Sequence, residues 1–217
     1  MCIRDSDITG SQVNGWEYAS TQSPARGKMW HFALSGKDYV LIPLSSGEVN
    51  VVERSGKVRV KLTNMLPIGN EVFLRVGSSL DKTYMVTADT AGTVVKLYMT
   101  DKKEALKLEQ VGANSTFTSV DFNSDRTLDY AFAWENNLVI TDNLNNVLHE
   151  MEISGTLSGG LQVLGGNLYG LSTVNQVYVF DASGKIKDGF PLKGANTMQL
   201  ADVNKDNTTN LVVALGK

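Results

Sequence analysis

The sequence is poor in the residues that most often carry catalysis and cross-linking. Its 217 residues include one cysteine, Cys2, and two histidines, His31 and His149. A single cysteine excludes an intramolecular disulfide, and neither histidine lies in a motif that would use it as a base or metal ligand. We therefore expect no thiol chemistry and no histidine-based site in this chain.

Long apolar runs and a strong charge of one sign are also missing. The 20 Lys and Arg against 23 Asp and Glu give a net charge of -3, so nothing in the charge predicts a nucleic acid or an anionic membrane as partner. No window approaches the roughly 18 uninterrupted apolar residues of a membrane-spanning helix. The glycines at 155, 159, 160, 165 and 166 lack the Lys-Ser/Thr pair of a phosphate-binding loop, which favours turns and tight connections.

What the sequence does contain is an internal repeat. A polar residue followed by an aromatic or aliphatic pair recurs at Asp38–Val40, Thr83–Met85, Asp129–Ala131, Asn167–Tyr169 and Asn210–Val212. The steps between the second members are 45, 46, 38 and 43 residues. A period of about 43 residues is typical of the four-stranded blade of a β-propeller.

Each repeat also keeps one internal order. A second apolar run follows after a short turn, at Val49–Val52, Val94–Tyr98, Leu138–Thr141 and Val177–Phe180. A polar turn and an alternating run such as Val58–Leu62 come next. Continuous apolar runs predict strands covered on both faces, and the alternating run predicts a half-exposed outer strand. The predicted fold is an all-β propeller of four-stranded antiparallel blades.

The repeat divides the chain into four blades and part of a fifth. We expect blades at residues 30–62, 71–109, 116–153, 161–192 and 197–217, the last without its third and fourth strands. Residues 1–29 are expected to be a non-native start, since Met1–Ser6 resembles a translated cloning adapter, followed by a linker or the end of a preceding blade. We expect the natural protein to continue beyond Lys217 and before Asp7, because a partial ring leaves blade flanks without neighbours.

Two repeats carry an acidic loop between their first and second strands. Both loops fit D-x-N-x-D-x-x-x-D/N, which places oxygen side chains at positions 1, 3, 5 and 9. A hard cation such as Ca²⁺ takes six to eight oxygens, and a carbonyl at position 7 would add one more. The predicted ligands are Asp121, Asn123, Asp125, Thr127 and Asp129 in the first loop and Asp202, Asn204, Asp206, Thr208 and Asn210 in the second.

A metal-free interpretation of the same loops is also open. Asp and Asn are the natural residues of Asx-turns. When the repeats are aligned, position 9 corresponds to Asp38 and Asn167, whose repeats lack the loop. If a metal binds, we expect a structural role, because the ion would occupy the oxygens of a strand connection and leave no open position for a substrate.

With these motifs the chain resembles the calcium-binding repeats of the FG-GAP and VCBS type, which include bacterial envelope proteins. The stretch Asp188–Leu192 leading into Asp202 is similar to their blade junction, and Gln176–Lys185 is similar to blades of PQQ-like propellers. In that family position 6 is usually Gly, which supplies a left-handed backbone; here it is Arg126 in one loop and Asn207 in the other.

Three functions compete at this point. The leading hypothesis is a non-catalytic binding or scaffold propeller, periplasmic, cell-surface or extracellular, with structural Ca²⁺ and a protein or carbohydrate ligand at one rim. The second is a propeller enzyme, either a quinoprotein-like dehydrogenase or a glycosidase or lyase that needs two well-placed carboxylates. The third is an outer-membrane assembly-type propeller that grips client strands by edge pairing.

Overall fold

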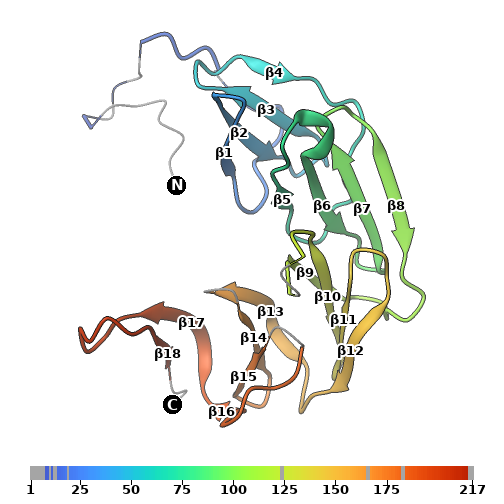
Figure 1. The fold of residues 1–217 in the computed structure, drawn as a ribbon, viewed down its shortest axis with the longest axis vertical. Helices are drawn as coiled ribbons and strands as arrows, with labels where there is room; N and C mark the ends of the chain where they lie inside the picture. The colour runs from blue at the N-terminus through green and yellow to red at the C-terminus, as the bar shows by residue number, and fades with distance from the viewer. Residues whose placement is uncertain are drawn as a thin grey trace. The chain divides into compact units, whose positions relative to one another are not determined.

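The computed structural model describes residues 8–9, 11, 14–18, 20–122, 125–164, 167–181 and 184–214. Over these residues the chain is β-structure with one short 3-10 helix, η1 (Leu80–Lys82) (Figure 1). None of their helical segments is long and apolar enough to cross a membrane. The predicted all-β class of four-stranded antiparallel sheets is confirmed.

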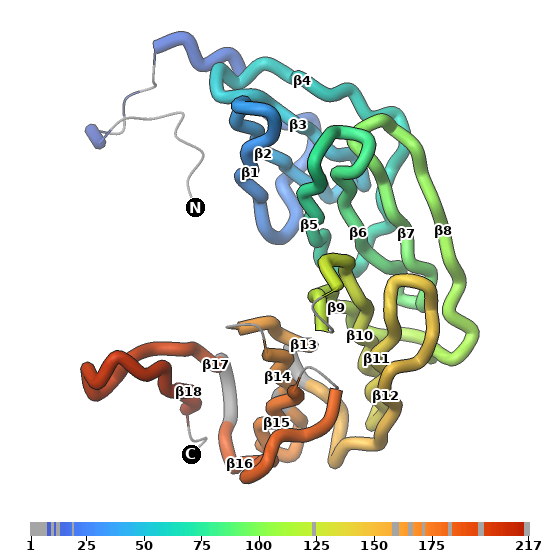
Figure 2. Tube along the Cα trace, in the orientation of Figure 1, coloured from blue at the N-terminus to red at the C-terminus, as the bar shows by residue number. Residues whose placement is uncertain are grey.

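The chain forms two compact units. Unit 1 comprises residues 1–89 and 93–107, and unit 2 comprises residues 90–92 and 108–217. The trace in Figure 2 passes through the sheets one after another, and each is completed before the next begins. This local connectivity is what short turns between antiparallel neighbours produce.

Unit 1 holds two sheets. The first has the order β1 (Trp30–Leu34), β2 (Lys37–Pro43), β3 (Val49–Glu53) and β4 (Val58–Val60). The second has the order β5 (Phe73–Arg75), β6 (Tyr84–Ala88), β7 (Thr93–Tyr98) and β8 (Lys103–Lys107).

Unit 2 holds two further four-stranded sheets and one pair. The third sheet contains β9 (Thr116–Val120), β10 (Asp129–Trp134), β11 (Asn137–Thr141) and β12 (Val147–Glu152). The fourth contains β13 (Leu157–Leu164), β14 (Asn167–Ser172), β15 (Gln176–Phe180) and β16 (Leu192–Lys193), and β17 (Ala195–Ala201) pairs with β18 (Asn210–Ala214).

The fourth sheet departs from the expected pattern at both edges. Gly159 and Gly160, interpreted as turn residues, lie within β13, which begins at Leu157 and shifts register between Leu157 and Leu161. A strand that shifts register can accommodate glycines without ending. At the other edge Ile186 makes only a single bridge to Phe180, and the short β16 follows after Pro191, whose nitrogen has no hydrogen to donate.

Burial separates the middle strands from the outer ones, as the sequence predicts. All residues of β10 except Trp134 are buried, whereas β8 and β12 are mostly exposed. In unit 1 one apolar cluster joins Leu41 and Val51 of the first sheet to Met85 and Leu97 of the second, all with no exposed surface. Each such side chain stabilises the fold by about 1.5–3 kcal/mol through burial.

The same arrangement recurs in unit 2. One cluster joins Ile140 of the third sheet to Leu168 and Phe180 of the fourth. Another joins Tyr169 and Val177 of the fourth sheet to Met198 of β17. Within each unit, neighbouring sheets therefore pack face to face through apolar side chains.

A single backbone hydrogen bond closes every four-stranded sheet in the same way. After the fourth strand, a backbone N–H donates to a carbonyl in the turn between the second and third strands. The pairs are Leu66 to Gly47 at 2.8 Å, Leu108 to Gly92 at 3.0 Å, Ile153 to Asn136 at 2.7 Å and Gly194 to Asn175 at 3.0 Å. The repeat seen in the sequence is thus also a repeat of backbone hydrogen bonding.

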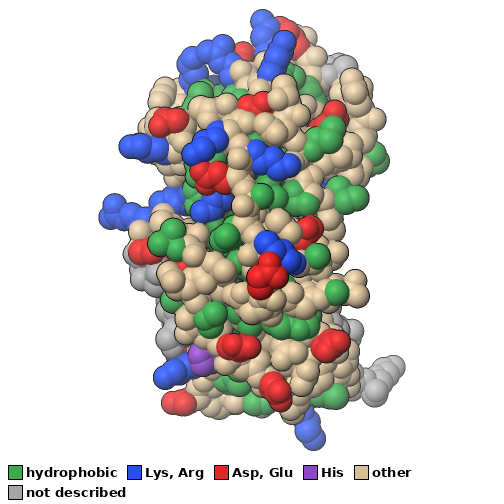
Figure 3. Space-filling model, turned by 90° about the vertical axis from the view of Figure 1, so that its right-hand side faces the viewer, with side chains coloured by type: hydrophobic (Ala, Val, Ile, Leu, Met, Phe, Trp, Pro, Cys, Tyr) green, Lys and Arg blue, Asp and Glu red, His purple; other side chains and the backbone are tan. Residues whose placement is uncertain are grey.

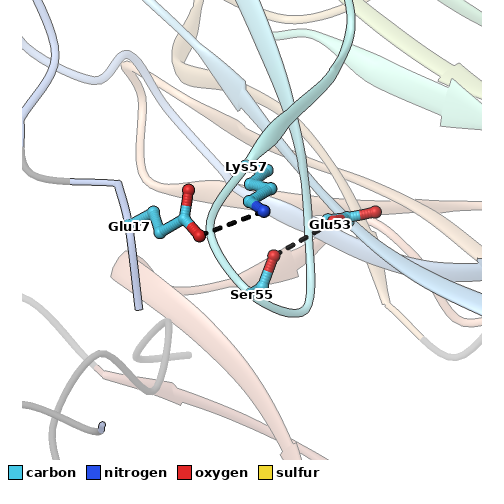
Figure 4. A network of polar contacts seen from close by, with 4 residues as sticks. All are labelled: Glu17, Glu53, Ser55 and Lys57. Atoms are coloured by element: carbon cyan, nitrogen blue, oxygen red, sulfur yellow. Dashed lines mark hydrogen bonds and ion pairs between the residues drawn. The ribbon is translucent and has the colours of Figure 1, made fainter. Parts of the chain in front are cut away.

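The described part of residues 8–29 contains no strand and lies along the first sheet. Trp16 and Tyr18 pack against the buried Ile42, Leu44 and Val52. The N–H of Glu17 donates to the carbonyl of Ser55 at 2.8 Å, and its carboxylate lies 3.2 Å from Nζ of Lys57 (Figure 4). In the same turn Ser55 donates to Glu53 at 3.0 Å. These contacts fasten the segment to the turn between β3 and β4.

Candidate functional site

The two acidic loops occupy equivalent places in unit 2. The first connects β9 to β10 and the second connects β17 to β18. Val120 pairs with Asp129 and Ala201 pairs with Asn210, so each loop starts directly after the last paired residue of one strand. Position 9 is in both cases the first paired residue of the next strand.

The aspartate at position 1 organises each loop in the same manner. Asp121 accepts the N–H of Asp125 at 3.1 Å on one oxygen and that of Arg126 at 2.9 Å on the other. Asp202 accepts the N–H of Asp206 at 3.1 Å and that of Asn207 at 3.0 Å. One carboxylate therefore fixes the turn of the backbone around itself.

The aspartate at position 5 repeats this role toward position 7. Oδ1 of Asp125 accepts the N–H of Thr127 at 2.7 Å and also the Thr127 hydroxyl. Oδ1 of Asp206 accepts the N–H of Thr208 at 2.7 Å and the Thr208 hydroxyl. The Thr208 hydroxyl, followed by its backbone N–H, lowers the pKa of Asp206 below its usual value, so this carboxylate is ionised at neutral pH.

Position 6 has a left-handed backbone in both loops. The φ angle is 70° at Arg126 and 65° at Asn207. The family resemblance implies this conformation through its usual glycine, and the loops adopt it without one. Asn accepts it at low cost, whereas for Arg the conformation costs about 1–2 kcal/mol. In the second loop Lys205 at position 4 also has a left-handed backbone, with φ of 60°, so each loop holds one long side chain in this conformation.

Position 9 differs between the loops in burial. Asp129 is completely buried, and its Oδ2 accepts the N–H of Phe122 at 2.9 Å. Asn210 is half-buried, and its Oδ1 accepts the N–H of Val203 at 3.0 Å. Both side chains fasten the start of the loop to the start of the following strand.

Positions 3 and 7 complete the predicted ligand set. Asn123 lies outside the described residues. In the second loop Nδ2 of Asn204 donates a hydrogen bond to Oδ2 of Asp206 at 2.7 Å. The carbonyls of Thr127 and Thr208 stay predicted donors.

The donor set fits a hard cation that takes oxygen ligands. Every predicted side-chain ligand is a carboxylate or an amide, with no sulfur or imidazole. Among the described residues, no group of three or more His, Cys, Asp and Glu is placed to hold a metal. A site in either loop would thus depend on amide and carbonyl oxygens as well as carboxylates.

The carboxylate of Asp142 interacts with the first acidic loop, although the loop motif in the sequence does not include it. Burial raises the pKa of Asp142, in the turn between β11 and β12, but hydrogen bonds from Asn146 and Leu144 outweigh it and leave the pKa lowered. The charge of Asp125 also acts on Asp142 and raises its pKa. This turn lies beside the acidic loop only once the third sheet has folded. The spacing of acidic residues in the loop therefore does not predict the interaction with Asp142.

His31 and a cleft in unit 1 contain the groups that a catalytic site could use. His31 Nε2 lies 3.3 Å from Oδ1 of Asp38, and both side chains are nearly half exposed. In unit 1 a cleft of about 620 Å³ is lined by two carboxylates, Asp38 and Glu53, together with Trp16, Lys37 and Arg54. Asp38 is engaged by His31, and Glu53 accepts the Ser55 hydroxyl. These pairings make the two carboxylates structural partners of neighbouring side chains.

Comparison with known proteins identifies the fold. No protein-family model matches the chain, and no curated protein matches it. The computationally designed protein Ika8 is similar in structure, with TM-score 0.58 and 14% identity over 95% of this chain and 63% of Ika8. BBS1N, solved in complex with ARL6DN, has TM-score 0.53 and 13% identity over 90% of this chain and 76% of its own.

A second designed protein extends this comparison. Ika4 has TM-score 0.51 and 15% identity over 79% of this chain and 99% of its own. The chain thus spans somewhat less than two thirds of Ika8 and most of Ika4. At these identities the likeness concerns the fold alone, and it shows that the sheets of this chain are blades of the β-propeller type.

Proposed function

We propose that this chain is a non-catalytic binding or scaffold propeller in which two strand connections of unit 2 are fixed by structural Ca²⁺. The observation that carries the proposal is the repetition of one hydrogen-bond framework in both acidic loops. Positions 1, 5 and 9 accept the same backbone N–H groups at the same register. This agreement marks the two loops as copies of one structural element, which supports one shared role for both.

The repeat type belongs to the same proposal. The loop motif and its left-handed position 6 support repeats of the FG-GAP and VCBS type, and Gln176–Lys185 supports a PQQ-like blade. In the first loop Asp121, Asn123, Asp125, Thr127 and Asp129 would hold the ion, and in the second Asp202, Asn204, Asp206, Thr208 and Asn210. When bound, Ca²⁺ supplies positive charge that offsets repulsion among the carboxylates.

The proposed partner is a protein or carbohydrate ligand held at one rim of the blades. Loops at a rim vary freely while strands keep the frame, so that is where recognition residues are placed. The propeller-type neighbour BBS1N is solved in complex with ARL6DN, which supports a protein as the first candidate. A periplasmic, cell-surface or extracellular location fits this function, because millimolar calcium fills weak sites there.

The enzyme hypothesis has one observation in its favour. Asp38 and Glu53 line the same cleft, as the two carboxylates of a glycosidase or lyase would. Their engagement by His31 and Ser55 favours the binding hypothesis instead. The assembly-type propeller, which grips client strands by edge pairing, is the further alternative.

Calcium-dependent thermal unfolding tests the proposal. At about 5 mM Ca²⁺ and an extracellular-type Kd of about 0.1–1 mM, each filled loop should add about 1–2 kcal/mol of stability. The Tm should rise by about 2–4 °C for each kcal/mol, and EDTA should reverse the rise.

Variants separate a metal site from a metal-free turn. Asp125→Asn keeps an oxygen acceptor for Thr127 but removes the charge, so it should keep most of the stability in EDTA and lose the calcium increment of its loop. Asp206→Asn should do the same in the second loop. Asp188→Asn, an exposed change outside both loops, is the matched control. An unchanged Tm with calcium in the wild-type chain would make the loops metal-free Asx-turns.

A further inference from the structure

Arg26 is tied into unit 1 by its backbone and by one end of its side chain. Its backbone N–H donates to the carbonyl of Pro43 at 2.7 Å, beside the isolated bridge between Ala25 and Leu44. Its Nη1 donates to the carbonyl of Pro67 at 2.9 Å, in the linker between the first two sheets. The guanidinium group is thus held in one orientation between these two segments.

The other edge of this guanidinium group has no partner among the residues that the structure describes. Nε and Nη2 of Arg26 are both buried, and neither donates a hydrogen bond to an acceptor of those residues. These two nitrogens form the side edge of the planar group, and their N–H bonds run parallel, in the geometry that grips two oxygens at once. Buried polar groups are otherwise paired in folded proteins, so two unpaired donors on one charged edge call for a ligand.

The charge of Arg26 is also uncompensated. Burial lowers the pKa of its guanidinium, and no carboxylate of the described part of the chain acts on it in the opposite direction. Glu48, on the nearby turn after β2, accepts the hydroxyl of Ser46 at 3.2 Å. Lys28 adds a second cation two residues along, with its ammonium 4.1 Å from the ring centre of Trp30. Leaving a partly buried charge with two buried, unpaired donors is costly, and an anion that accepts from both donors lowers that cost.

We propose that Arg26 is the anchor of a small oxyanion site, in which Nε and Nη2 bind one carboxylate or phosphate group through two parallel hydrogen bonds. A purely structural role of Arg26 would explain the hydrogen bond from Nη1 to Pro67. It would not explain the unpaired edge formed by Nε and Nη2. Because both nitrogens are buried, the proposed binding requires a local outward movement of the chain around Arg26, and its neighbours Pro24, Ala25 and Gly27 lie exposed at the surface.

NMR of the arginine Nε–Hε groups in the 217-residue chain tests the site directly. Sodium phosphate and sodium acetate are titrated separately at constant ionic strength. The Nε–Hε signal of Arg26 should shift with saturation in at least one series, and the tighter series identifies phosphate or carboxylate as the preferred group. A signal that never saturates, or one that moves together with that of the exposed Arg59, would overturn the proposal.

A stability measurement provides the second readout. The anion that saturates the Arg26 signal should raise the Tm of the wild-type chain and of Arg59→Lys, which pairs only loosely with Glu53 at 3.9 Å. Arg26→Lys keeps the charge and loses the two-pronged edge, so the rise should disappear in that variant. An equal rise in Arg26→Lys would overturn the proposal. If Arg26→Lys fails to fold, the wild-type titration alone decides.

Discussion

At the scale of residues, several turns of this chain place asparagine in a left-handed backbone. Positive φ angles occur at Asn114, Asn145, Asn175 and Asn207, and Asn is enriched at such positions because its short side chain bonds locally. Because Asn is enriched at such positions, these turns could be predicted from the sequence. Arg126 could not, because its conformation is imposed by the bond from its N–H to Asp121.

Asp101 shows what one turn residue contributes inside unit 1. Its Oδ1 accepts the N–H of Thr63 at 2.9 Å and that of Asn64 at 3.0 Å, and its Oδ2 accepts the Thr63 hydroxyl. These bonds, the Thr63 hydroxyl first, lower the pKa of Asp101. The carboxylate therefore joins the linker after β4 to the turn between β7 and β8.

Asp101→Asn should lower the Tm at neutral pH by a few degrees. Asn tolerates the left-handed backbone of this position but loses the charge that strengthens the three bonds. Since the folded pKa lies below the unfolded value of about 3.9, the stabilisation is present above that value and lost as pH falls through the folded pKa.

Thermal unfolding from pH 7 down to about pH 2.5 checks this sign. The gap between wild type and Asp101→Asn should close below about pH 4. Asp188→Asn, which alters an exposed carboxylate, should show no gap at either end. A gap for Asp101→Asn that stays constant across the range would contradict the account.

At the scale of elements, the strands could be predicted and their edges could not. Middle strands such as β10, which is apolar from Tyr130 to Trp134, are recognisable in the sequence as continuous apolar runs because both of their faces are covered. The interpretation of Gly159 and Gly160 as turn residues was wrong, because a register shift that places glycines inside β13 depends on the partner strand and has no local sequence signal. The closing hydrogen bonds, such as Leu66 to Gly47, were also not predictable, since they join residues far apart in sequence.

Gly47→Ala should weaken the closure of the first sheet. A Cβ at Gly47 would stand 2.6 Å from the carbonyl oxygen of Leu66, and the φ of 92° already disfavours any side chain. Gly36→Ala is the matched control, because Gly36 has a φ of 72° and nothing within 4 Å of its Cβ position.

Denaturant unfolding measures the difference between the two variants. Gly36→Ala should cost about 1–2 kcal/mol for the backbone conformation alone. Gly47→Ala should cost about 1–3 kcal/mol more, because the carbonyl it meets is part of the closing bond. Equal losses in both variants would mean that the contact with Leu66 is not structurally important.

At the scale of the whole molecule, the two units differ in charge. Unit 1 has 14 Lys and Arg against 11 Asp and Glu, whereas unit 2 has 6 against 12. The face drawn in Figure 3 carries exposed Lys and Arg side chains interspersed with Asp and Glu. Net charge over the whole sequence conceals this contrast, because the division into units follows the fold.

The acidic loops give the charge of unit 2 a specific consequence. Calcium added to the intact chain should act on unit 2 at those loops and leave unit 1 unchanged, because both loops lie in unit 2. An effect of ionic strength alone would instead be spread over both units, since screening acts on all exposed charges.

Hydrogen–deuterium exchange with and without calcium, at matched ionic strength, tests the central claim most directly. The account predicts slower exchange with calcium at residues 120–129 and 201–210, where backbone N–H groups of both loops are held by the aspartates, and no change in β1 to β8. Exchange that calcium leaves unchanged in both loops, or slows equally in both units, would contradict it.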